Sequence, residues 1–136
     1  MKNNVLAVVI GIIAAMMVVM LGDRIAFSIF PPPENLDFND PVSVQQLVDG
    51  MPIAAHLLLF FNWSVSAFVG GLVTTKLSKS KWQLLCVITG ALLLTANILN
   101  MFVIPYPIWL IMITVLMYLP VTYLGGKLIA PKTESV

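Results

Sequence analysis

Residues 5–30 of the chain read VLAVVIGIIAAMMVVMLGDRIAFSIF, and three prolines follow directly. A helix needs roughly 20 residues to cross a hydrocarbon core of about 30 Å, and the uninterrupted run up to Leu21 is slightly shorter than that. The helix can continue to Phe30, because most of the remaining residues are again apolar, and the prolines then end it. The stretch predicts a first membrane span over residues 5–30, with Asp23 and Arg24 inside its far end.

Three further apolar runs are long enough to cross a membrane, at about residues 52–75, 82–103 and 108–129. They are continuous rather than alternating, so the sequence lacks the period-two pattern of a membrane β-barrel. The chain is 60% hydrophobic and only 10% charged, whereas soluble domains carry about 25% charged residues. We therefore expect an all-α membrane protein, a single four-transmembrane-helix bundle formed by residues 1–136.

The charged residues are divided between the two predicted sides of the membrane. All the lysines lie at or near the ends of apolar runs on one side: Lys2, Lys76, Lys79, Lys81, Lys127 and Lys132. Every acid except Glu134 lies on the other side: Asp23, Glu34, Asp37, Asp40 and Asp49. Because cytoplasmic loops are rich in lysine and arginine, the pattern predicts a multi-pass protein with both termini in the cytoplasm.

The outer loop is then formed by residues 31–51, between the first two spans. Within it, Asp40-Pro41 is typical of a helix N-cap followed by proline at the first helical position. Gly50 is a suitable stop for the short helix that would follow. We expect this extracytoplasmic helix to lie along the membrane surface.

Several classes of function are disfavoured by what the sequence lacks. A net charge of +1 argues against nucleic-acid binding, which needs a concentrated basic face. The single cysteine, Cys86, excludes an internal disulfide and a multi-cysteine metal site, and one histidine cannot form a His-based metal site. There is no Gly-rich phosphate loop and no GxSxG motif. We expect no enzyme activity, no metal and no cofactor.

Small residues recur every four positions on two of the expected spans. They are Ala7, Gly11 and Ala15 on the first, and Ser66 and Gly70, with Gly71 beside them, on the second. Helices in lipid associate through such faces, where backbones can approach closely. These residues are candidates for helix packing within one protomer, and alternatively for the interface of a homo-oligomer.

Polar residues at membrane depth form the candidate site. Five of them lie at similar depth near the outer ends of their spans: Asp23, Arg24, His56, Asn97 and Asn100. The sequence predicts an outer-leaflet cluster in which Asp23 or Arg24 faces His56 and the asparagines. Such a cluster can hold a ligand, an ion or a proton. Alternatively, the charged pair reaches the headgroups by snorkelling and the others join helices by hydrogen bonds.

Asn62 lies near the expected midplane of the second long span. It shares one helical face with Ser66, and Trp63 lies next to it, far from either membrane interface. These residues can line a small pocket or pathway. Alternatively, Asn62 is a hydrogen-bonded core amide, because an unsatisfied amide in lipid costs several kcal/mol.

Three segments together carry a family resemblance: PPPENLDFNDP at 31–41, NWSVSAFVGGLVTTKL at 62–77 and IPYPIW at 104–109. In these segments the chain resembles a group of uncharacterised small bacterial four-transmembrane-helix inner-membrane proteins. The resemblance implies a multi-pass protein of the bacterial inner membrane, and it implies no catalytic residue.

Three functions remain open from the sequence. The first is a non-catalytic accessory subunit or small homo-oligomeric scaffold, with membrane lipids and a larger membrane complex or further copies as partners. The second is a small oligomeric transporter or channel, which predicts that His56, Asn62, Asn97 and Asn100 face one wet cavity. The third is a lipid-binding or lipid-modifying protein, which needs an opening toward lipid beside His56.

Overall fold

The computed structural model describes residues 2–31, 37, 39–78, 81–103 and 106–129 of the chain. Its helices are α1 (Lys2–Ile29), α2 (Pro41–Asp49), α3 (Ile53–Leu77), α4 (Trp82–Val103) and α5 (Ile108–Ile129). In this described part no strand occurs. Helices α1, α3, α4 and α5 are each long and apolar enough to cross a membrane. The prediction of an all-helical chain with four such helices is therefore confirmed for these residues.

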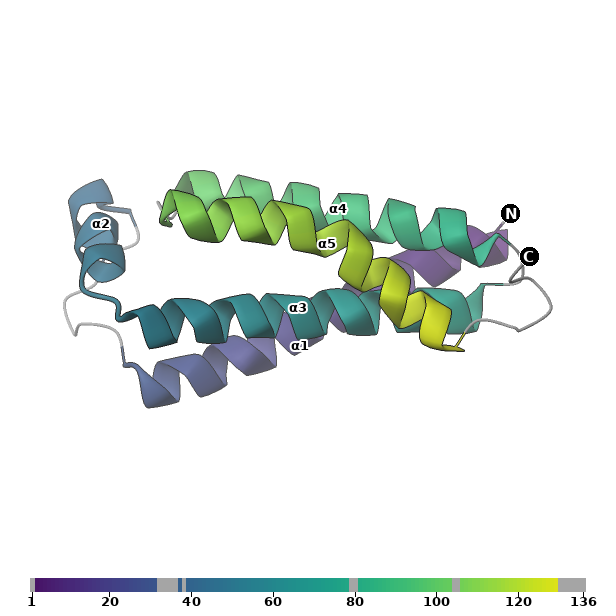
Figure 1. The fold of residues 1–136 in the computed structure, drawn as a ribbon, viewed down its shortest axis with the longest axis horizontal. Helices are drawn as coiled ribbons and strands as arrows, with labels where there is room; N and C mark the ends of the chain where they lie inside the picture. Colours follow the sequence, from purple (N-terminus) through teal and green to yellow (C-terminus); the bar gives the residue numbers. More distant parts are fainter. Residues whose placement is uncertain (1, 32–36, 38, 79–80, 104–105, 130–136) are drawn as a thin grey trace.

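Helix α3 is the centre of the bundle. It packs against α1, α4 and α5, while α4 also packs against α5 and α1 contacts α4. Figure 1 shows the four long helices side by side, with the start of α1 and the end of α5 at one end of the bundle. Helix α2 lies across the opposite end of the bundle, which we name the α2 end. We name the first end the lysine end, because Lys76 and Lys127 occupy the last turns of α3 and α5.

Helices α1 and α3 meet through their small residues. Ala7 and Ala15 are fully buried, and the Ser66 hydroxyl donates a hydrogen bond of 2.9 Å to the Ala15 carbonyl. At Gly11 the space of a Cβ is already taken by the side chain of Thr74. The two backbones can approach this closely because neither carries a bulky side chain at the contact.

Helices α3 and α5 approach just as closely at the lysine end. A Cβ on Gly71 would collide with the backbone carbonyl of Thr122, and a Cβ on Gly125 would collide with that of Phe68. Pro120 lies inside α5, where it removes a backbone N–H donor, and Figure 1 shows that this helix bends along its length. The close contacts leave little room between the helices at this end.

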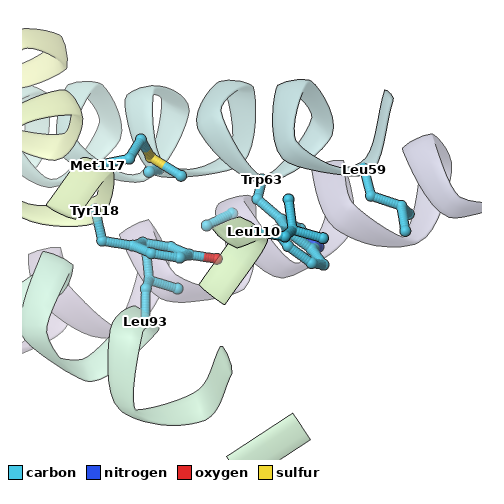
Figure 2. Packing of buried hydrophobic residues seen from close by; sticks show 8 residues of the cluster. Leu59, Trp63, Leu93, Leu110, Met117 and Tyr118 are labelled. Carbon is cyan, nitrogen blue, oxygen red and sulfur yellow. The ribbon is translucent and has the colours of Figure 1, made fainter. Parts of the chain in front are cut away.

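Bulkier side chains separate the helices toward the α2 end. A buried cluster fills the bundle there and in its middle, and Figure 2 shows its larger members: Leu59, Trp63, Leu93, Leu110, Met117 and Tyr118. The change from glycine and alanine to aromatic and branched residues along the same helices widens the bundle. This widening is what positions the cavity described below.

Helix α2 begins and ends where its capping residues lie. The Asp40 carboxylate accepts a hydrogen bond of 3.1 Å from the N–H of Val42, and Pro41 is the first helical residue. The Gly50 N–H donates to the Gln46 carbonyl at the other end. The rest of the expected outer loop includes residues 32–36 and 38, which lie outside the described part of the chain.

Candidate functional site

A cavity of about 710 Å³ lies at the α2 end of the bundle. Residues of all five helices line it, together with Tyr106, which precedes α5. Most of the lining is apolar. Its polar members are Asp23, Gln46, Ser66, Asn97, Asn100, Tyr106 and Tyr118.

The cavity is closed toward the middle of the bundle by a contact of three helices. A Cβ on Gly70 of α3 would lie 3.2 Å from both Ala15 of α1 and Leu93 of α4. Ser66 and Leu93, which are close to this contact, form the deep end of the lining. Beyond it, Thr74 and Thr89 join α3 to α4 by a buried hydrogen bond of 3.0 Å.

The lining of the cavity reaches the outer surface on α1 and α4, and also beside α2, where Gln46, Gly50 and Pro52 are exposed. Met16 and Met20 line it from α1 with exposed fractions of 57% and 64%, and Phe27 does so with 44%. Ala96 and Asn100 line it from α4 and are exposed as well. These residues form a rim on the outer surface of the bundle. The rest of the outer face of α1 also carries exposed apolar side chains.

Asp23 is the acidic group of the cavity. The Asn62 side-chain amide donates to the Asp23 carboxylate and to the Val19 carbonyl, at 3.2 Å each. Asn62 is buried, and its side chain occupies the space that a Cβ on Gly22 would need. Among the described residues that line the cavity there is no lysine, arginine or histidine. The carboxylate therefore depends on one neutral donor from α3.

Asn97 is the second polar anchor of the cavity. Its amide nitrogen donates a hydrogen bond of 3.0 Å to the Tyr118 hydroxyl. Its side-chain oxygen is buried and has no hydrogen-bond partner among the described residues, and the residue as a whole is 9% exposed. An unpaired buried acceptor of this kind costs about 1–3 kcal/mol. Asn97 therefore joins α4 to α5 through Tyr118, and its enclosed oxygen has no surface that a molecule in the cavity can reach.

Aromatic rings form one wall of the cavity beside Asp23. Trp63 and Tyr106 meet edge to face, with ring centroids 5.4 Å apart and planes at 81°. Burial, and to a lesser extent the negative charge of Asp23, raises the pKa of Tyr106 to about 12. The Tyr106 phenol therefore stays neutral at ordinary pH and does not compensate or add to the charge of the site.

His56 lies away from this cavity. It is 4% exposed and packs edge to face against Trp109 of α5, with ring centroids 6.0 Å apart. Its Nδ1 atom is buried without a hydrogen-bond partner in the described part of the chain. Arg24 is exposed and does not line the cavity either.

The polar residues singled out in the sequence thus fall into separate places. Asp23, Asn97 and Asn100 share the cavity, and Asn62 supports Asp23 from behind. His56 belongs to a contact with α5. The small residues Gly11, Ala15, Ser66, Gly70 and Gly71 lie at helix contacts within one chain.

Two tyrosines of the site, Tyr106 and Tyr118, are not among the candidate residues that the sequence indicates. Nothing in their spacing indicates that they share a cavity, because they come from different parts of the bundle. Gly22, directly before Asp23, is a signal that places Asp23 near another helix, because glycine inside a span indicates close approach of a neighbouring helix.

Metal binding has no support in the described residues, where no three His, Cys, Asp or Glu side chains come together. Among the described residues that line the cavity, Asp23 is the only acidic one. Comparison of the chain with protein-family models, curated proteins and solved structures finds no match, so no residue role is carried over from a relative.

Proposed function

We propose that this chain is a non-catalytic, multi-pass protein of the bacterial inner membrane that binds a lipid-like molecule in the cavity at the α2 end. The observation that carries the proposal is the cavity itself, with its apolar walls, its few polar groups and its exposed rim residues on α1 and α4. Ligand sites in proteins have this composition and commonly occupy about 300–1,000 Å³. If the bundle spans a membrane, this rim faces acyl chains.

The proposed orientation puts the cavity in the outer leaflet. The lysines gather at the lysine end, as expected for a cytoplasmic side, whereas Asp40 precedes α2 and Asp49 is its last residue at the other end. Both termini are then cytoplasmic. A lipid-like molecule would enter sideways from the outer leaflet and would not need to cross the bundle.

A binding site is better supported than an open channel through one chain. The cavity ends at the contact of Gly70 with Ala15 and Leu93. Between there and the lysine end, α3 and α5 are in backbone contact at Gly71. A path for a solute along the bundle would require these helices to separate.

The proposal can be tested by filling the cavity from its rim. Ala96→Trp places a large ring at the rim, whereas Ala91→Trp places the same ring on an exposed site of α4 outside the lining. Native mass spectrometry of protein released from mild detergent should show a retained lipid on the wild type and on Ala91→Trp. Ala96→Trp should lose most of that retained mass. Equal retention by all three proteins would contradict the proposal.

The accessory-subunit function stays a prediction beside this one. Purification in a gentle detergent at native expression level, followed by determination of mass and of co-purifying proteins, tests it. A large partner in fixed stoichiometry would assign the chain to a complex, in which the cavity holds a lipid at the subunit boundary. A homo-oligomer without partners would favour the scaffold or the oligomeric transporter.

A further inference from the structure

We propose that the molecule bound in the cavity is a lipophilic cation, a positively charged nitrogen or phosphorus centre on an apolar body, held with its charge against Asp23. The inference rests on the proposed binding function and adds the chemical class of the ligand. It is carried by the polar groups of the lining, by the aromatic wall beside Asp23 and by the absence of basic residues among the described lining residues.

The Asp23 carboxylate has unused capacity to accept. It brings a negative charge into an apolar site, and among the described residues its hydrogen-bond donor is the neutral side chain of Asn62. An ionised group at membrane depth is costly unless it is paired. A ligand that carries positive charge pairs with Asp23, whereas an anionic or purely accepting ligand leaves its charge without a counter-charge.

The aromatic wall strengthens the same preference. Trp63 and Tyr106 lie edge to face in the lining, and Trp63 directly follows Asn62, whose side chain donates to Asp23. Ring faces attract cations, tryptophan most strongly, and they do so even when the cation has no hydrogen to donate. A quaternary ammonium or a phosphonium can therefore be held here as well as a protonated amine.

The described lining contains no basic residue, and this decides between two classes of positively charged ligand: an aminophospholipid and a lipophilic cation without a phosphate. An aminophospholipid carries an ammonium group, but its phosphate would be placed in a cavity that has no described lysine or arginine to pair with it. Arg24 is exposed and outside the lining. A lipophilic cation without a phosphate meets no such penalty, and this is the ligand class to which the proposal commits.

The test uses two probes of nearly the same shape and opposite charge, tetraphenylphosphonium and tetraphenylborate. Binding of each is measured by equilibrium titration of the full chain in phosphatidylcholine nanodiscs, with Ala96→Trp nanodiscs as the baseline for partition into lipid. We expect specific binding of the cation only. Asp23→Asn should weaken it about tenfold or more, since a buried charge pair is lost, and Asp23→Glu should retain most of it.

The neighbouring charge provides the matched control. Arg24→Gln changes the net charge by one unit at the next position but outside the cavity, so the affinity for tetraphenylphosphonium should stay within about threefold of the wild type. The thermal unfolding midpoint of each variant shows whether it is folded. If Asp23→Asn does not fold, the comparison of the two probes on the wild type still decides the preference.

The outcomes separate the two proposals. If neither probe binds above the Ala96→Trp baseline and no lipid is retained, the binding function itself fails. If both probes bind alike, or Asp23→Asn binds the cation as the wild type does, the site binds apolar molecules but the cation inference is overturned. If phosphatidylethanolamine in the nanodisc displaces the phosphonium, the site belongs to an aminophospholipid and the inference is likewise overturned.

Discussion

At the scale of single residues, the site depends on side chains that satisfy one another across helices. Asn62 illustrates this, because its amide joins the Asp23 carboxylate to α3 while its side chain fills the space above Gly22. The amide has two functions at once: it donates a hydrogen bond to a carboxylate among apolar helices, and it fits α1 against α3. Neither the carboxylate nor the amide would be favourable there alone.

Replacing this amide should therefore destabilise the protein. Asn62→Ala leaves Asp23 without its donor, and we expect the free energy of unfolding to fall by about 1–3 kcal/mol. Ser64→Ala is the control, because the Ser64 hydroxyl bonds only to the Phe60 carbonyl of its own helix and should change stability by less than about 0.5 kcal/mol. Unfolding by SDS in mixed micelles measures both. Similar losses for the two variants would refute the structural role given to Asn62.

At the scale of helices, the spacing of small residues decides where the elements touch and where they separate. Gly71 allows α3 to reach the backbone of α5, whereas Trp63, two turns earlier on α3, lies where the helices are held apart. The cavity is thus a consequence of how residue size changes along α3.

A graded pair of glycine substitutions tests this packing. A Cβ on Gly71 would meet the backbone of Thr122, which cannot move away without shifting α5; a Cβ on Gly90 would meet only side chains of Leu119 and Thr122, at 3.1–3.3 Å. We expect Gly71→Ala to lower the thermal unfolding midpoint clearly more than Gly90→Ala, in line with overpacking costs of about 1–3 kcal/mol or more. If Gly90→Ala is the more damaging of the two, the α3–α5 contact described here is wrong.

At the scale of the whole molecule, the asymmetry of charge matches the asymmetry of shape. Helix α2 and its acids Asp40 and Asp49 lie at the end of the bundle where the cavity is found, and the lysine end is closely packed. If the bundle spans a membrane in the proposed orientation, the cavity is open to the outer leaflet. The position of the ligand and the direction of its access both depend on that orientation.

Orientation can be measured by cysteine labelling. Asn39 precedes α2 and Ser78 follows α3, so the structure puts them at opposite ends of the bundle. In a background lacking Cys86, a membrane-impermeant maleimide added to intact cells should label Asn39→Cys, and it should label Ser78→Cys only after the membrane is opened. Labelling of both positions from outside would rule out the four-span arrangement.

The sequence by itself determined the helices and their approximate limits: α1 begins at Lys2, before the expected residue 5, and α3 continues to Leu77, beyond the expected residue 75. Apolar runs of sufficient length predict α1, α3, α4 and α5, and the residues that end or cap a helix act locally: proline after Phe30, and Asp40 and Gly50 around α2. Small residues four apart also indicated which faces of α1 and α3 can approach closely. These features depend only on neighbours along the chain, so no knowledge of the tertiary arrangement was needed.

Only the tertiary structure decided which polar residues meet. Counting residues along the expected spans places Asp23 and His56 at similar depth. In the structure Asp23 lines the cavity beside Asn62, whereas His56 packs against Trp109. Depth along a helix follows from counting residues, whereas a partner depends on how each helix is rotated and where it crosses its neighbours. Those angles result from packing of all the faces together, which is why the cavity could not be derived from any one span.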